Sequence, residues 1–235
     1  MDGLLAALDA LIAKKRAVKR GAMQELLSGE TRLPGFKGEW MTRSLGEIGS
    51  FTNGRGITKG DVASDGVPCI RYGELYTHHH DFVRRFYSFV PRSVAKQSYR
   101  LRTGDLLFAG SGETREEIGK CAAYLLADEA YAGGDIVVLR PLGHDPKYLG
   151  YLMNTEDVCD QKSQIGQGDA VVHIYARDLS KMRLRLPNAN EQVAIATVPA
   201  DMDAEIEGLE RRREKTRQIK QAMMQELLTG RTRLV

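Results

Sequence analysis

The chain has 235 residues, a formal net charge of +3 and an apolar content of 42%. This length allows one domain with an appendage, or two small domains. No run approaches the roughly 18 apolar residues of a membrane span, and the first residues lack the basic leader and cleavage pattern of a secretion signal. Cys69, Cys121 and Cys159 are far apart and form no CxxC pair, which argues against a structural zinc site. We therefore expect a cytoplasmic protein with reduced thiols and no metal.

Charge is divided unevenly along the chain. Residues 36–102 carry eleven Lys/Arg against six Asp/Glu, which gives +5, whereas residues 103–200 carry nine against fourteen, which gives −5. A basic part joined to an acidic part can present a positive face to a polyanion. The counts are equally compatible with a folded chain in which positive and negative residues intermix on the surface.

An early stretch of the chain is repeated near its end. Met23–Leu33 is almost the same as Met224–Leu234, at an offset of 201 positions, and this offset aligns about 33 positions in all. In both copies apolar residues recur at steps of three and four, which predicts amphipathic helices. Gly29 and Gly230 stand where a left-handed cap would end each helix.

The middle of the chain reads as a compact domain that follows a linker at residues 34–38. Short segments bounded by Gly, Pro or Asp predict strands at residues 66–72, 105–109, 121–126, 135–140 and 171–175. A helix is expected over residues 147–159 and a loop over 166–169. Charged and apolar residues alternate over residues 183–187. Helical periodicity resumes at Asn190, and Pro199 is expected to kink that helix.

The two terminal helices are expected to pair. A helix with a single apolar stripe is poorly stable alone, so an antiparallel pair is the economical arrangement. The predicted fold is therefore α+β, with one mixed, strand-rich domain at residues 35–189 between long helices in residues 1–34 and 190–235. The positions expected in the helix seam or in subunit contacts are Leu4, Leu8, Leu11, Val18, Leu26, Ile206, Leu209, Ile219, Met223 and Leu227.

Catalytic motifs are weak in this sequence. Phe108–Gly112 fits the short FxGxG pattern of methyltransferases that use S-adenosylmethionine, and Asp145–Tyr148 resembles their DPPY motif, but Lys147 replaces a proline. The alternation of strands and long helices that builds a doubly wound cofactor domain is missing. The spacing from Gly112 to Lys120 is too long for a phosphate loop. We expect no catalysis and no cofactor.

Three adjacent histidines, His78 to His80, form the strongest metal-like cluster. In an extended segment neighbouring side chains point to opposite faces, so the three imidazoles cannot all reach one ion. A polar loop that faces phosphates or bases is the preferred interpretation, and plain solvent exposure is equally compatible. Ser111 has no base beside it in the sequence, and structural roles are expected for His144 and His173.

Binding chemistry is better represented than catalysis. The loop at residues 53–60 combines glycines, which allow close backbone approach, with cations that neutralise phosphate. Residues 71–78 supply an arginine fork, two aromatic rings and groups able to read base edges. Lys162 lies in a further polar cluster. The residues expected to contact DNA are Asn53, Arg55, Lys59, Arg71, Tyr72, Tyr76, His78, His79, His80, Arg84, Arg85, Ser111, Arg115, Gln164 and Gln167.

Several of these segments occur together in one known family. They are Trp40–Ile48, Ile70–Leu75, Gly104–Phe108 with Ser111–Gly112 and Ile118–Lys120, Tyr148–Leu152, Leu186–Pro187 with Glu191–Gln192 and Ile195–Ala196, and the two terminal repeats. In this combination the chain resembles the DNA-specificity subunit of type I restriction-modification enzymes. The resemblance extends over essentially the whole chain.

The resemblance implies a function. Such subunits hold two target-recognition domains, each reading one half of a split site in double-stranded DNA, spaced by antiparallel helices that contact the methyltransferase subunits. This sequence departs from the pattern, because it has one such domain between both helices. It is expected to be a non-catalytic specificity subunit that scaffolds methyltransferase and restriction subunits and forms a homodimer through its helices.

Two other functions stay open at the level of sequence. A stand-alone S-adenosylmethionine-dependent DNA methyltransferase is favoured only by Phe108–Gly112. A helical adaptor that binds protein and no DNA would also use the terminal helices. The target bases cannot be deduced, because recognition loops vary freely on one scaffold.

Overall fold

The computed structural model describes residues 1–168 and 171–229. The chain divides into two compact units. We call Met1–Thr31 with Thr197–Val235 the helical unit and Arg32–Ala196 the central unit. The functional boundaries predicted at residues 34/35 and 189/190 stay predictions, and the cap predicted at Gly230 lies outside the described residues.

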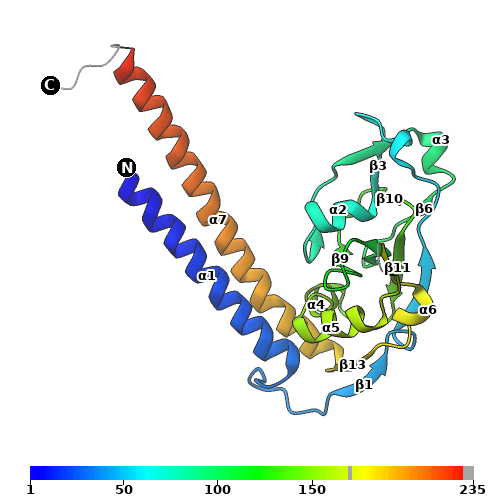
Figure 1. Cartoon of the computed structure of the whole chain (residues 1–235). Helices are drawn as coiled ribbons and strands as arrows, with labels where there is room; N and C mark the ends of the chain where they lie inside the picture. Colours follow the sequence, from blue (N-terminus) through cyan, green and yellow to red (C-terminus); the bar gives the residue numbers. More distant parts are fainter. Residues whose placement is uncertain (169–170, 230–235) are drawn as a thin grey trace. The chain divides into compact units, whose positions relative to one another are not determined.

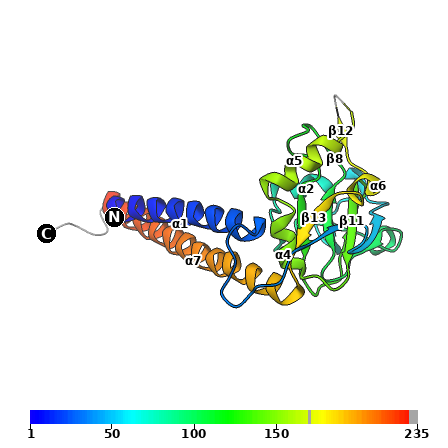
Figure 2. The same ribbon diagram turned by 90° about the horizontal axis from the view of Figure 1, so that it is seen from below.

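The helical unit is an antiparallel pair of long helices, α1 (Asp2–Ser28) and α7 (Ala189–Leu228). They lie side by side in both views (Figures 1 and 2). Gly29 ends α1 in the left-handed conformation, with φ 78°, as predicted for a glycine cap. Helix α7 continues through Pro199, and the kink expected there stays a prediction. The predicted α+β fold with paired terminal helices is confirmed.

The apolar seam between these helices is thin. Leu8, Ile12 and Ile206 are buried, and Leu209 is half-buried. Leu26 is also buried, at the end of α1. The other positions expected in the seam or in subunit contacts are exposed, namely Leu4, Leu11, Val18, Ile219, Met223 and Leu227. That these exposed side chains contact another chain therefore stays a prediction.

Ion pairs line the seam. Lys15 pairs with Glu205 at 2.7 Å, Arg16 with Glu210 at 2.5 Å, and Lys19 with Asp203 at 2.6 Å. Asp9 pairs with Arg213 at 3.0 Å, and Asp2 pairs with Lys220. From Asp2 to Lys19 on α1 the partners run from Lys220 back to Asp203 on α7, with only the neighbouring pairs of Lys15 and Arg16 out of order, so the pairs follow the antiparallel direction.

The repeat gives this pair an approximate twofold symmetry. At the offset of 201 positions Asp2 corresponds to Asp203 and Lys19 corresponds to Lys220. The pairs Asp2–Lys220 and Lys19–Asp203 therefore join equivalent residues with the two helices exchanged. Each copy of the repeat supplies both signs of charge, and each binds the opposite end of the other copy.

The central unit contains two main sheets and two small ones. The five-stranded sheet has the order β2 (Gly49–Asn53), β11 (Ile136–Pro141), β7 (Leu106–Ala109), β9 (Cys121–Tyr124), β4 (Phe82–Val83). The four-stranded sheet has the order β5 (Ser88–Val90), β3 (Val67–Ile70), β10 (Tyr131–Ala132), β6 (Tyr99–Arg100). The small sheets pair β1 (Met41–Ser44) with β13 (Arg183–Leu186), and β8 (Ser111–Gly112) with β12 (Val172–His173).

Short helices connect the strands of the central unit. They are the 3-10 turn η1 (Lys59–Asp61) and the helices α2 (Tyr72–Thr77), α3 (Arg92–Ala95), α4 (Pro146–Leu152), α5 (Glu156–Ile165) and α6 (Ala176–Leu179). The pairings β3–β10 and β4–β9 are parallel, and the other described strand pairs are antiparallel. The two main sheets therefore each contain both parallel and antiparallel pairs.

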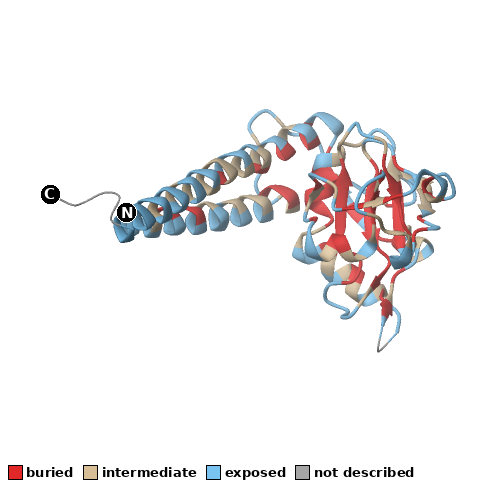
Figure 3. Cartoon of the chain, turned by 90° about the horizontal axis from the view of Figure 1, so that it is seen from above, coloured by how far each residue is buried: buried red, intermediate tan, exposed pale blue. Residues whose placement is uncertain are grey.

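The core of the central unit lies on β7, β9 and β11. All residues of β7 and β9 are buried, and in register Leu107 faces Val138 on one side and Ala122 on the other. Figure 3 shows this burial concentrated in the strands of the central unit. These strands are continuous apolar runs because both of their faces are covered.

The segment predicted as one helix over residues 147–159 forms two, α4 and α5. Asn154 lies at the break, where its side chain accepts from the backbone N–H of Cys121 at 3.1 Å and donates to the Cys121 carbonyl at 2.8 Å. A tertiary hydrogen-bond pair thus overrides the helical pattern. The other difference is α2, which begins at Tyr72, inside the stretch expected to be extended.

The residues after β13 also have a structural role. Glu191 is fully buried and accepts two hydrogen bonds from Arg32, at 2.5 and 2.8 Å. Gln192, also buried, donates to the carbonyl of Pro187 at 2.9 Å and accepts from the Asp145 amide at 3.0 Å. The hydrogen bonds of Glu191 and Gln192 together fix the connection from β13 to α7 within the central unit.

We expect Ile206→Ala to destabilise the helical unit by about 2–4 kcal/mol, because it opens a cavity in a seam that has few buried apolar side chains. Urea unfolding followed by far-UV circular dichroism measures this. Ile219→Ala, at a side chain that is 46% exposed, is the matched control and should change stability by less than about 0.5 kcal/mol. Equal effects of the two substitutions would contradict the seam as described.

Candidate nucleic-acid interface

Helix α2 is attached to the four-stranded sheet through a buried carboxylate. Glu74 is 4% exposed, and its Oε1 lies 3.3 Å from Arg71 Nε and within hydrogen-bond reach of the Ser88 hydroxyl. Arg71 Nε also donates to Ser88 Oγ at 3.1 Å. Burial works to raise the pKa of Glu74, but His79, Ser88 and Arg71 together outweigh it and lower that pKa. The Nε of Arg71, a residue predicted to read bases, is therefore engaged in holding α2.

The three histidines after α2 have different environments. His78 is exposed and stacks on Tyr87 with ring centroids 3.9 Å apart, and His80 is exposed. His79 is only 1% exposed, and its Nε2 lies 3.8 Å from Glu74 Oε2. The expectation that His79 faces DNA is thus corrected: its ring fills the space behind α2. In the described part of the chain, no three His, Cys, Asp or Glu side chains gather as metal ligands.

The segment after β4 presents cations on aromatic rings. Arg85 donates to the Tyr87 hydroxyl at 2.6 Å and lies 4.6 Å from the ring centroid. Arg84 lies 5.9 Å from the centroid of Phe82. Tyr87 therefore has His78 stacked on it and a guanidinium beside it, which pre-organises the cluster at an exposed position.

A second group lies on β8, β12 and the start of α6. Ser111 Oγ lies 3.0 Å from His173 Nδ1. The His173 ring stacks with Tyr175 at 6.2 Å, and Arg177 lies 5.3 Å from the Tyr175 centroid. Tyr175 is 45% exposed. Sequence reasoning missed this group, because Ser111 and His173 are far apart in the chain and meet only through the β8–β12 pairing.

Tyr76 connects the two groups. Its hydroxyl donates to the backbone carbonyl of Ser111 at 3.0 Å, and Gly112 allows this approach because a side chain there would meet that hydroxyl at 2.7 Å. Figure 2 shows α2 near β8 and β12. We call the combined surface the aromatic face; it consists of Tyr72, Tyr76, His78, Arg85, Tyr87, His173, Tyr175 and Arg177. Ser111, which was expected to contact DNA, is buried at 5% exposure and contacts His173 of this face.

The second predicted polar cluster is partly structural. Lys162 is 1% exposed, and its ammonium donates to the carbonyls of Gly119 and Met153 at 2.9 and 2.8 Å. Burial lowers the pKa of Lys162. Arg115 donates to the carbonyls of Gly166 and Gly168. Gln164 and Gln167 are exposed, and Gln167 donates to Asp178 at 3.2 Å.

The loop at residues 53–60 has its own local structure. Gly54 is buried, and a side chain there would meet the Gly133 carbonyl at 1.9 Å. This glycine therefore serves close packing of two backbone segments. Thr58 and Asp61 form a capping box around η1, whereas Asn53, Arg55 and Lys59 are exposed.

The Asp145–Tyr148 motif is a helix start. Asp145 Oδ1 accepts from the Tyr148 backbone N–H at 2.7 Å, and Pro146 occupies the first turn of α4. This is the usual arrangement at a helix N-terminus. Tyr148 is fully buried, so it is not placed to hold an extruded base.

The sequence matches the family described as type I restriction modification DNA specificity domain over residues 37–218. The chain belongs to this specificity family. It is 24% identical over 143 residues to the type I restriction enzyme StySPI specificity subunit of Salmonella potsdam, a match that covers 60% of this chain and 31% of that protein.

Solved specificity subunits share the fold. The HsdS subunit from Thermoanaerobacter tengcongensis superposes with a TM-score of 0.57 at 18% identity, covering 96% of this chain and 55% of that one. The type I S subunit from M. genitalium gives a TM-score of 0.65 at 13% identity, covering 96% and 57%. The chain therefore spans from about a third to just over half of the length of these relatives. Among the described residues no helix is both long and apolar enough to cross a membrane.

We predict that Glu74→Gln destabilises the central unit by about 2 kcal/mol at pH 7, because hydrogen bonds to a charged group are lost. The folded-state pKa of Glu74 lies below its ordinary value of 4.5, so its ionised form stabilises the fold above that pH, and this contribution is lost as pH falls through the folded pKa. The difference from the parent should therefore shrink toward pH 3. Denaturant unfolding followed by fluorescence of the single tryptophan, Trp40, measures it, with Glu113→Gln, at an exposed glutamate, as the control. A constant difference at all pH values would show that the carboxylate charge is not responsible.

Proposed function

We propose that this chain is a non-catalytic DNA-specificity subunit whose central unit recognises one half of a bipartite target. The observation that supports this proposal most directly is the match to the specificity family over residues 37–218. The aromatic face gives it a physical basis, because exposed rings with guanidinium groups beside them can provide both apolar and hydrogen-bonding contacts to base edges. Exposed Asn53, Arg55, Lys59 and Arg84 add contacts to phosphates.

In this mechanism the two kinds of contact have separate effects. Arginine and lysine contacts to phosphates supply salt-dependent affinity that is independent of sequence. The side chains of the aromatic face supply discrimination, at about 1–3 kcal/mol for each good contact to a base. The buried Glu74 holds α2, and the buried Lys162 joins the β8–β9 connection to the α4–α5 break, so that the face is presented in one conformation.

The helical unit is proposed to bind the methyltransferase subunits and, through the assembly, the restriction subunits. Its exposed apolar side chains Leu4, Leu11 and Val18 recur at intervals of seven residues on α1. An exposed stripe of this kind is typical of a helix that packs against another chain. Neither the methyltransferase alternative nor the protein-only adaptor is favoured by a comparable observation.

A second copy of the chain is proposed to complete the target recognition. The equivalent leucines of the repeat have opposite environments: Leu26 and Leu27 are 7% and 4% exposed, whereas Leu227 and Leu228 are 37% and 83% exposed. All of residues 221–229 are exposed. Because the helix pair is approximately twofold symmetric, the uncovered apolar end is proposed to be the surface that a second copy of the chain covers.

We expect Tyr175→Ala or His78→Ala to relax base preference by about tenfold at one or two positions, because each removes a ring that contacts bases. The measurement is selection of bound sequences from a random duplex pool by the reconstituted methyltransferase complex. Arg183→Gln, at an exposed position of β13, is the control. Unchanged preferences in all variants would reject the aromatic face as the reader, and the absence of any duplex binding would favour the protein-only adaptor.

Self-association should be visible at micromolar concentration and should be lost in Leu228→Arg, which places a charge on the uncovered apolar end. Sedimentation velocity measures both. Leu142→Arg changes a side chain that is also exposed, at 72%, but lies in the central unit, and it should not alter the sedimentation coefficient. A parent chain that stays monomeric across this range would refute the dimer.

A further inference from the structure

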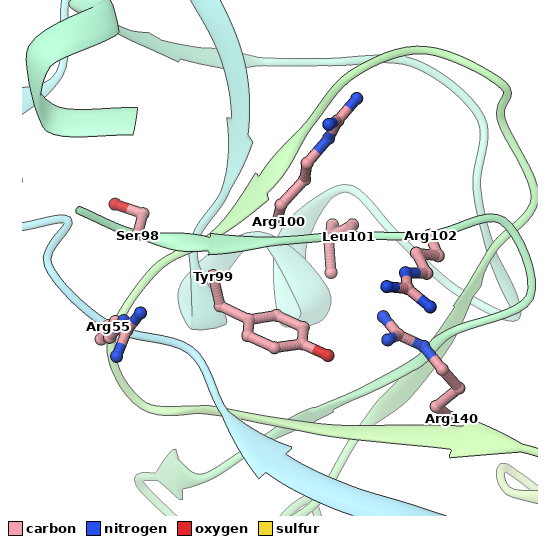
Figure 4. A pocket seen from close by; sticks show the side chains of 7 residues that line it. All are labelled: Arg55, Ser98, Tyr99, Arg100, Leu101, Arg102 and Arg140. Atoms are coloured by element: carbon pink, nitrogen blue, oxygen red, sulfur yellow. The ribbon is translucent and has the colours of Figure 1, made fainter. Parts of the chain in front are cut away.

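A hollow of about 560 Å³ lies on the central unit, away from the predicted loops except for Arg55. It is lined by Arg55, Ser98, Tyr99, Arg100, Leu101, Arg102 and Arg140. Strands β6 and β11 and the residue two positions after β2 bring these side chains together (Figure 4). None of these lining residues is acidic, so a concave surface carries several guanidinium groups.

Arg140 is fixed in the hollow. Its Nε and Nη2 donate to the two carboxylate oxygens of Asp105, both at 2.7 Å, and Asp105 is 1% exposed. The guanidinium carbon lies 5.8 Å from the Tyr99 ring centroid. A bidentate pair of this kind holds the guanidinium plane rigidly, and the single Asp105 carboxylate neutralises one positive charge.

Arg102 and Arg55 leave further charge at the hollow. The backbone of Arg102 donates to Asp105 at 2.8 Å, but no acidic partner of its side chain is found among the described residues. Figure 4 shows the Arg102 and Arg140 guanidinium groups facing each other beside the Tyr99 hydroxyl, with Arg55 on the other side of the ring. Arg100 points away in this view, and its charge acts on Glu129.

We propose that Arg102 and Arg140, with the Tyr99 hydroxyl, form a binding site for a phosphate group, and that Arg55 adds positive charge on the other side of the Tyr99 ring. Two facing guanidinium groups repel each other unless an anion lies between them, and arginine forks match the oxygens of a phosphate. The volume exceeds that of one phosphate and falls in the range of small-ligand sites, so an attached sugar also fits. The phosphate belongs either to the backbone of a duplex or to a free nucleotide; only the duplex source rests on the function proposed above.

The first test uses phosphate compounds without a duplex. Isothermal titration of the full chain with inorganic pyrophosphate and with ATP should show binding, and Arg102→Gln should weaken it by about tenfold because a charge-assisted contact is lost. Arg185→Gln makes the same charge change at an exposed site on β13 and should have no effect. Arg102 is exposed, and equal thermal unfolding midpoints of the two variants would verify that both fold.

The second test measures how binding of a random-sequence duplex depends on salt. If the site takes a backbone phosphate, Arg102→Gln lowers the slope of log affinity against log salt by about 0.9, equally for target and non-target duplexes. Loss of pyrophosphate and ATP binding with an unchanged slope assigns the site to a free nucleotide. If the chain binds no duplex, the first test alone decides. No effect of Arg102→Gln in either test overturns the proposal.

Discussion

Charge specifies the direction of the helix pair, whose seam has few buried apolar side chains. Three leucine and isoleucine side chains, Leu8, Ile12 and Ile206, are buried along the seam, and five ion pairs join α1 to α7. An isolated surface ion pair contributes little to stability, but a set of pairs in one register excludes the shifted and parallel arrangements, which would bring like charges together. The ion pairs therefore act chiefly on direction and register.

In the central unit, buried charged groups position the exposed ones. Glu74 holds Arg71 and the start of α2, Asp105 holds Arg140, and Lys162 joins the β8–β9 connection to the end of α4. Each buried charge is satisfied largely by fixed neighbours, as burial in a region of low dielectric demands. The surfaces proposed to bind DNA and phosphate thus rest on a rigid scaffold, which suits a protein that must present several side chains together.

The sequence predicted the long-range plan of the molecule better than its local surfaces. The repeat, the glycine cap at Gly29 and the short apolar runs predicted the paired helices and the strands β3, β7, β9, β11 and β12, because these features follow from periodicity. It could not show that His79 is buried, since its neighbours His78 and His80 are exposed and all three are chemically alike. The Ser111–His173 contact and the arginine-lined hollow arise from strand pairings between distant segments, for which a single sequence gives no local signal.

The exchanged ion pairs have a consequence for how chains recognise one another. Asp2–Lys220 and Lys19–Asp203 are the same contact with the two helices exchanged, and the α7 helix of a second copy carries the same charges as a chain's own α7. Covalent connection, which keeps the local concentration of the attached helix high, selects the closed hairpin in dilute solution. Crowding many chains together removes that advantage, and reciprocal exchange of helices between molecules then satisfies every charge equally well.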